Sequence, residues 1–456
     1  MGKRSYEIDM CHGSLLPKIL QFSFPLMLSG VLQLLFNAAD IIVVGRYSGK
    51  EALAAVGSTS ALINLIINIF LGLSIGTNVL VARYIGAKEE QNISEAIHTS
   101  ILTSLVSGTA LIFLGGFLAE PLLTLMGTPD DVLSQAALYM RIYFLSMPAV
   151  MLYNFGSAIL RAVGDTKRPL FFLTIAGCVN VVCNLFFVIV LHWGVAGVAT
   201  ATAISQLISA VLVLLCLVRE PGIYRVQWKK LRIHWGKLRE MIRIGLPAGL
   251  QGSIFSISNV LIQSSVNSFG SVAMAGNTAA SNIEGFIWTS MNAFYQANLS
   301  FTSQNMGARK YSRLNRIAGI SVGSVAILGF CMGVGSTVFA QTLLGIYNSD
   351  PEVIAFGVRR MHFVALFSCI GGVMDVMVGS MRGLGYSVLP TVVALTGACA
   401  FRVVWIFTVF AHDPTPETLF FSYPVSWVLT GLAHITCFLI ARRKLPKQDE
   451  GLPEAQ

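Results

Sequence analysis

Long apolar stretches, separated by short charged or turn-rich segments, run along nearly the whole chain. Each stretch holds about 20 residues or more, the length that an α-helix needs to cross a hydrocarbon core of ~30 Å. Their limits predict spans at residues 15–45, 52–82, 93–118, 134–160, 170–192, 194–218, 241–268, 273–303, 315–341, 354–381, 388–411 and 419–440. The pattern therefore predicts an all-α integral membrane protein with twelve transmembrane helices.

Composition and charge agree with this prediction. Apolar residues make up 54% of the chain, charged residues only 12%, and the mean hydropathy is +0.70, which excludes an ordinary soluble protein. If the N-terminus is cytoplasmic, most of the 31 Lys and Arg residues fall on the cytoplasmic side, and the outer loops are mainly acidic. We therefore expect a multi-pass protein of the plasma (inner) membrane with both termini in the cytoplasm. The net charge of +9 then reports topology and does not indicate nucleic-acid binding.

The start of the chain predicts a retained first helix. The first fourteen residues, MGKRSYEIDMCHGS, contain no apolar core followed by a small-residue cleavage site. The first span is therefore expected to stay in the mature protein.

The two halves of the chain repeat each other. A shift of 221 residues places Gly86-Ala87-Lys88 on Gly307-Ala308-Arg309, and the loop RAVGDTKRP on RGLGYSVLP; a shift of 222 places Pro25 on Pro247. Between the halves lies a basic segment, which is either a solvated tether or an amphipathic segment on the anionic inner leaflet. We expect an N-terminal six-helix lobe at 1–218, a cytoplasmic basic linker at 219–240, a C-terminal six-helix lobe at 241–441 and a cytoplasmic tail at 442–456.

Several of these motifs, in order and at the repeat spacing, resemble the multidrug and toxic compound extrusion (MATE) transporters. They are the opening FPLMLSGVLQLLFNAADIIVVGRYSGKEALAAVG, the GA[KR] loop after both second helices, QNMGARK at 304–310, and the paired RxxG…P loops. The resemblance implies two six-helix lobes that form a V-shaped cleft. It also implies efflux of organic cations by antiport with H+ or Na+, in a protein that functions as a monomer without a cofactor.

Asp40 is the first candidate for ion coupling, because a charge within the membrane is costly unless it is paired or hydrated. Asn37 lies three residues before it, and Asn180 and Asn184 share one face of the fifth predicted helix. A carboxylate that faces amides can bind Na+ or hold a proton. Asp40 can instead serve only as a hydrogen-bonding group at a helix end.

The resemblance assigns the same role to Asp40, which matches the acid of the N-terminal lobe in the DinF-like branch. Members of that branch commonly carry an Asp where this chain has Asn184. One acid therefore stands where those members have two, and the coupling ion stays open between H+ and Na+.

The C-terminal half has two further candidate cavity acids, Glu284 and Asp375. Asp375 is the repeat equivalent of Asn154, which we include among the ion-coupling candidates for that reason. Arg402, in the eleventh predicted span, is the expected partner of these acids. Cavity function and structural pairing are both open for Glu284 and Asp375.

Proline and cysteine add little chemistry. Pro25 is a candidate bending point of the first helix, although a static kink used in packing is slightly favoured, because membrane helices tolerate proline widely. Glycine pairs such as Gly72/Gly76 have the spacing of close helix contacts. The eight cysteines form no CxxC motif, so neither a metal site nor a disulfide framework is expected.

Other functions are less compatible with the sequence. A flippase for a lipid-linked precursor shares this broad architecture, but it should place several cations in the membrane to meet a pyrophosphate, and Arg402 is the main one found. An enzyme should show a nucleophile, base or metal cluster, and HExxH and GxSxG are absent from the sequence. No GxxxxGK[ST] loop for ATP is present, and nothing suggests a pore ring. The expected partners are small organic cations and the lipid bilayer.

Overall fold

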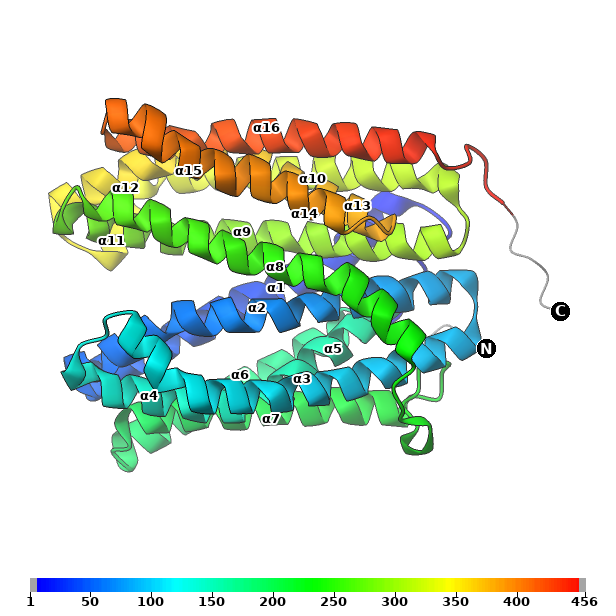
Figure 1. The fold of residues 1–456 in the computed structure, drawn as a ribbon, viewed down its shortest axis with the longest axis horizontal. Helices are drawn as coiled ribbons and strands as arrows, with labels where there is room; N and C mark the ends of the chain where they lie inside the picture. Colours follow the sequence, from blue (N-terminus) through cyan, green and yellow to red (C-terminus); the bar gives the residue numbers. More distant parts are fainter. Residues whose placement is uncertain (1–5, 451–456) are drawn as a thin grey trace. The chain divides into compact units, whose positions relative to one another are not determined.

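The computed structural model describes residues 6–450, except for the side chains at positions 50, 53, 58 and 61. Within these residues the chain is helical and contains no strand (Figure 1). Residues 1–5 and the last part of the expected 442–456 tail lie outside the described residues. The first half contains α1 (Leu15–Tyr47), α2 (Gly49–Ala87), α3 (Glu90–Leu125), α4 (Asp130–Leu145), α5 (Met147–Val163), α6 (Lys167–Leu185) and α7 (Gly194–Arg219).

The second half repeats this order with more interruptions. It contains α8 (Trp235–Asn267), α9 (Ser271–Gly307), α10 (Tyr311–Val338), α11 (Ala340–Tyr347), α12 (Pro351–Phe363), α13 (Ser368–Gly383), α14 (Val388–Ala394), α15 (Phe401–Trp405) and α16 (Pro416–Arg443). The short 3-10 turn η2 (Trp228–Lys230) lies in the connection between the halves.

The all-helical membrane architecture is confirmed, and every predicted span overlaps a helix or a group of adjoining helices. Among the described residues, 8 helices are long and apolar enough to cross a membrane, or up to 10 if each bent pair counts as one span. Helices α8 and α9 fall outside that count. They have 33 and 37 residues, enough to cross, but they carry many Ser, Asn and Gln side chains.

Two of the predicted spans, 134–160 and 354–381, are not single straight helices. The pair α4 and α5 bends by 47°, and the pair α12 and α13 bends by 49°. Pro148 explains the first bend, because it lies at the start of α5 and has no N–H to continue the α4 ladder. Both bends adjoin a glycine of the neighbouring helix: a Cβ at Gly108 would meet the backbone of Pro148, and one at Gly329 would meet that of Cys369.

The backbone also repeats at the loops. Lys88 and Arg309, which follow the second helix of each half, have φ of 59° and 53°. Gly164 and Gly385 have φ of 96° and 100°, also 221 residues apart. Left-handed residues satisfy the last carbonyl groups of a helix, so the GA[KR] and RxxG motifs act as helix ends. Each half also contains a π-helical segment near the end of its fifth span, η1 (Phe186–Val190) and η4 (Ile406–Phe410), and the second half has another, η3 (Leu395–Ala400).

The described chain forms two compact units, and the division passes through helices rather than through a loop. One unit consists of residues 6–8 and 28–253, and the other of residues 9–27 and 254–450. The first part of α1, up to Met27, thus belongs to the second unit, although α1 ends in the first. The first part of α8, up to Ser253, belongs to the first unit.

Close glycine packing explains why the start of α8 belongs to the first unit. A Cβ at Gly72 or Gly76 of α2 would meet the backbone of Gly249, Gly245 or Met241 of α8. The expected use of the Gly72/Gly76 pair in helix packing is therefore confirmed.

Candidate functional site

The site around Asp40 depends on a close approach between α1 and α6. The ring of Phe36, one turn before Asp40, lies against the backbone of Gly177, where any Cβ would overlap it. Gly177 stands one turn before Asn180 and two turns before Asn184 on the same helix. Because residues three, four and seven positions apart share a helix face, this contact brings the Asp40 carboxylate to the two amides.

A chain of hydrogen bonds joins these polar groups. The Asn184 side-chain N–H2 donates to Asp40 Oδ1 and also to Asn180 Oδ1, the latter at 3.3 Å. Asn180 Nδ2 in turn lies 3.5 Å from Thr202 Oγ1 of α7. The structure therefore brings together three of the predicted residues, Asp40, Asn180 and Asn184.

One oxygen of this cluster has no donor. Asn184 Oδ1 is buried and accepts no hydrogen bond from any described residue. A buried amide oxygen without a partner costs about 1–3 kcal/mol, so it is unusual in an apolar helix. Together with the half-buried carboxylate of Asp40, it provides oxygen ligands for a small hard cation, or an acceptor beside a protonated acid.

Three residues near Asp40 were not predicted from the sequence. Thr202 lies within hydrogen-bonding reach of the carboxylate, and Tyr139 and Tyr143 of α4 are close enough to interact with it electrostatically. The two tyrosine rings stack with their centroids 6.0 Å apart. The sequence held a signal for Thr202, which is a polar residue within the apolar α7. It held no signal for the two tyrosines, because aromatic residues are frequent throughout the chain.

Asn37 and Asn154 are placed differently from the other amides. Asn37 is exposed, and no hydrogen bond joins it to Asp40 among the described residues. Asn154 Nδ2 donates to the carbonyl of Val150 in its own helix, at 2.8 Å. Pro25 lies inside α1, two residues before the boundary between the compact units.

Glu284 has a partner other than the expected Arg402. Arg360 of α12 donates Nε–H to Glu284 Oε1 at 2.9 Å and Nη2–H to Oε2 at 2.7 Å. Its third nitrogen, Nη1, donates to Asn277 Oδ1 at 2.7 Å, and Asn277 Nδ2 donates to Gln263. Glu284 and Arg360 are only 4% and 6% exposed, so this is a buried, two-pronged ion pair.

The expected pairing of Arg402 with a membrane acid is therefore wrong for Glu284. The guanidinium of Arg402 lies over the rings of Tyr423 and Trp427, 4.2 and 5.6 Å from their centroids. Its Nε–H donates to the hydroxyl of Ser426. Aromatic faces attract a cation and so stabilise this buried guanidinium, although its Nη2 has no hydrogen-bond partner among the described residues.

Asp375 is half-buried on α13, and the cation that acts on it is Arg382, two turns further along the same helix. Arg382 itself donates to the Tyr295 hydroxyl at 2.7 Å. No ion pair joins Asp375 to Arg360 or Arg402 among the described residues. Among the described residues, no three His, Cys, Asp or Glu side chains come together as a metal site.

Comparisons with known proteins identify relatives along nearly the whole chain. The family model MatE matches residues 25–186 and again 247–408. The matches start 222 residues apart, so they confirm the internal repeat. The probable multidrug resistance proteins YoeA and YpnP of Bacillus subtilis are 28% and 30% identical to the chain, over 90% of both sequences for YoeA and over 83% of this chain and 84% of the relative for YpnP.

A solved structure supports the fold. A mutant of the MATE transporter VcmN from Vibrio cholerae superposes with a TM-score of 0.88, at 22% identity, over 94% of this chain and 97% of the other. The two-lobe helical membrane fold is therefore shared with that protein.

Proposed function

Because the chain belongs to the multidrug and toxic compound extrusion (MATE) family, we propose that it is a secondary active transporter that exports organic cations or drugs by antiport with H+ or Na+. The names of YoeA and YpnP support the substrate class. Asp40, which resembles the acid of the N-terminal lobe in the DinF-like branch, supports a place in that branch. We further propose that it functions as a monomer in the plasma membrane, with both termini cytoplasmic, as the distribution of Lys and Arg suggests.

The observation that carries this proposal is the unpartnered Asn184 Oδ1 beside Asp40. An ion-coupling site must bind its cation reversibly, so it needs oxygen ligands that the protein does not satisfy by itself. Asp40 supplies the negative charge and Asn184 the unpartnered amide oxygen. The Asn180 oxygen accepts from the Asn184 N–H2 here and becomes a ligand when that bond opens.

Exchange requires that the ion and the drug favour different states of the protein. Binding of a cation or proton at Asp40 removes a charge from an apolar helix, and this change can favour one arrangement of α1 over another. We propose that Pro25 lets α1 bend in this step. Asn37 and Asn154 contribute only after a rearrangement, because neither is hydrogen-bonded to Asp40 here.

Transport by purified protein in vesicles tests the proposal, with a pH gradient and a Na+ gradient imposed separately and without ATP. Asp40→Asn keeps the size of the side chain but removes its charge and its proton, so gradient-driven efflux should be abolished while the thermal unfolding midpoint stays nearly unchanged. Asp375→Asn is the matched control and should retain gradient dependence. If Asp40→Asn protein still accumulated dye normally, ion coupling would have to lie elsewhere, with Asp375 the next candidate.

No observation favours the flippase over the antiporter. Two of the membrane arginines that could meet a pyrophosphate, Arg360 and Arg402, are buried and already engaged by Glu284 and by aromatic rings.

A further inference from the structure

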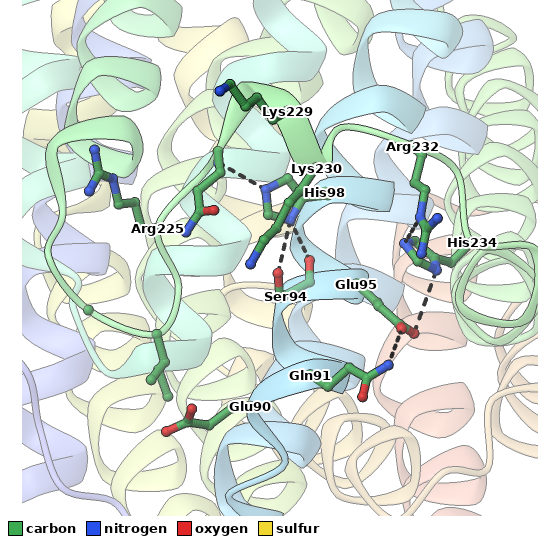
Figure 2. A pocket seen from close by; sticks show the side chains of 13 residues that line it. Glu90, Gln91, Ser94, Glu95, His98, Arg225, Lys229, Lys230, Arg232 and His234 are labelled. Atoms are coloured by element: carbon green, nitrogen blue, oxygen red, sulfur yellow. Dashed lines mark hydrogen bonds and ion pairs between the residues drawn. The ribbon is translucent and has the colours of Figure 1, made fainter.

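A polar pocket lies in the first compact unit, far along the chain from the Asp40 site. It has a volume of about 610 Å3 and lies between the first turns of α3 and the connection that follows α7. This volume is within the roughly 300–1,000 Å3 typical of small-molecule sites. Figure 2 shows Arg225, Lys229 and Lys230 on the connection, and Glu90, Gln91 and Glu95 along α3 on the other side of the pocket.

The connection is fixed in place by its own sequence pattern. Tyr224 and Val226 are buried, whereas the residues that alternate with them, Arg225 and Gln227, are exposed. The backbone N–H of Val226 donates to the carbonyl of Leu217 at 3.0 Å, and this bond ties the connection to the end of α7. The basic side chains therefore project from an anchored segment.

Two histidines attach the same connection to α3. The backbone N–H of Gln227 donates to His98 Nε2 at 2.9 Å, so the proton of this ring is on Nδ1, which donates to the carbonyl of Ser94 at 2.6 Å. The backbone N–H of His234 donates to Thr99 Oγ1, and its Nδ1 lies 3.6 Å from Glu95 Oε2. Both rings thus act as fixed structural links, and His98 is neutral.

Cations remain available in this pocket. Its lining includes Arg225, Lys229 and Lys230, and also Arg232, whose Nε–H donates to His234 Nε2 at 3.1 Å. Lys229 and Lys230 make no ion pair within the described part of the chain, and the Nε–H of Arg225 donates only to the carbonyl of Val218. On the acidic side, Glu95 is already engaged by Gln91 and His234. A pocket with unpaired cations on one wall favours an anionic ligand.

Apolar side chains beside these cations indicate where the anion comes from. Trp228 and Trp235 are 60% and 76% exposed, and Ile223, which lines the pocket, is also exposed. The pocket lies at the beginning of α3 and just after the end of α7, two helices that are long and apolar enough to cross a membrane. We therefore expect it near the membrane surface. Exposed tryptophans next to basic residues at this level are typical of contact with anionic lipid.

We propose that this pocket binds the phosphate-bearing headgroup of an anionic phospholipid. Lys229, Lys230 and Arg225 contact the phosphate, and Trp228 and Ile223 lie in the interfacial region of the same leaflet. A free phosphate would share the contacts with the cations, but it would gain nothing from the exposed apolar side chains.

The test measures binding and does not require transport, so it is independent of the proposed antiport. Purified full-length protein in a neutral detergent is titrated with phosphatidylglycerol, phosphatidylcholine or inorganic phosphate, and the thermal unfolding midpoint and the lipid retained in native mass spectrometry are recorded. Phosphatidylglycerol should raise the midpoint and be retained. Phosphatidylcholine and inorganic phosphate should do neither at equal phosphate concentration.

Paired substitutions separate the pocket from general surface charge. Lys229→Gln with Lys230→Gln should weaken phosphatidylglycerol binding roughly thirtyfold, from the contribution of two basic residues at an anionic surface. The matched control, Arg443→Gln with Lys444→Gln, removes two exposed neighbouring cations at the end of α16 and should bind as the wild type does. Lys229→Arg with Lys230→Arg should retain binding.

Three outcomes would overturn the proposal. Unchanged binding in the Gln pair would exclude these lysines from the site. If the Arg443→Gln, Lys444→Gln variant bound phosphatidylglycerol equally weakly, the loss of binding would be due to overall charge and not to this pocket. An equal response to inorganic phosphate would identify a site for a soluble anion instead of a lipid.

Discussion

The buried pair of Glu284 and Arg360 gives a quantitative test of its structural role. In Arg360→Met, the guanidinium is removed and the carboxylate stays buried at 4% exposure without a cation. Removal of one partner of a buried, hydrogen-bonded ion pair costs about 3–5 kcal/mol. In Glu284→Met, the remaining guanidinium keeps its bond to Asn277 and its position over the Phe420 and Tyr423 rings, so the cost should be smaller.

The double variant Glu284→Met with Arg360→Met is the decisive member of the cycle. It removes both charges of the pair, and the loss of the donor to the Asn277 oxygen costs about 1–3 kcal/mol. The double variant should therefore be more stable than Arg360→Met alone, and the coupling free energy should be about 2 kcal/mol or more. The free energies are measured by reversible unfolding in mixed detergent micelles.

The neighbouring residue offers a matched control. Arg359 is exposed and lies 3.6 Å from Glu417, so Arg359→Met should change the free energy of unfolding by only about 0–1 kcal/mol. Additive costs in the double variant would refute the reasoning, because they would mean that the pair does not act as a unit. Loss of ion coupling in the double variant, with folding intact, would instead assign Glu284 to transport.

Three further predictions concern packing, reactivity and topology. Gly115→Ala should destabilise the protein by roughly 1–3 kcal/mol because its methyl group would overlap the Phe144 ring, whereas Gly116→Ala, with open space around it, should be neutral or stabilising by about 0.5–1 kcal/mol in the same unfolding assay. Burial raises the pKa of the Cys11 thiol to about 11 from its ordinary 9.0, so alkylation of a variant with Cys11 as its sole cysteine should keep accelerating above pH 9; a plateau near 9 would contradict this. In a protein whose eight native cysteines are replaced, a cysteine introduced by Lys230→Cys should react with a membrane-impermeant maleimide only after the cells are permeabilised, and labelling of intact cells would reverse the proposed topology.

Hydropathy and repeats predicted most of the helical architecture, for a physical reason. The thickness of the bilayer fixes the length of the apolar segments, so each span can be located in the sequence where apolar residues give way to polar ones. The bends after Leu145 and Phe363 lie within apolar runs and were missed, although Pro148 was an available signal for the first. The π-helical segments were missed for the same reason, since they alter hydrogen bonding within an apolar run.

The candidate site was predictable where its residues share a helix face and unpredictable where they meet across helices. Asn180 and Asn184 are one turn apart, so their common direction followed from helix geometry, and their depth matched that of Asp40. The choice of Arg360 over Arg402 for Glu284 depends on how each helix is rotated about its axis. Residue spacing gives depth in the membrane but not that rotation, and Thr202 was missed for the same reason.

The assignment of α1 and α8 to the compact units has a consequence for biosynthesis. Residues 9–27 leave the ribosome among the first, yet the rest of their unit begins only at residue 254. All residues of the first unit, in contrast, have been synthesised once the ribosome has passed Ser253. The early part of α1 therefore remains without the helices it packs against in the second unit until the second half of the chain is inserted. Folding of the second unit is thus a late event that depends on a segment synthesised at the start.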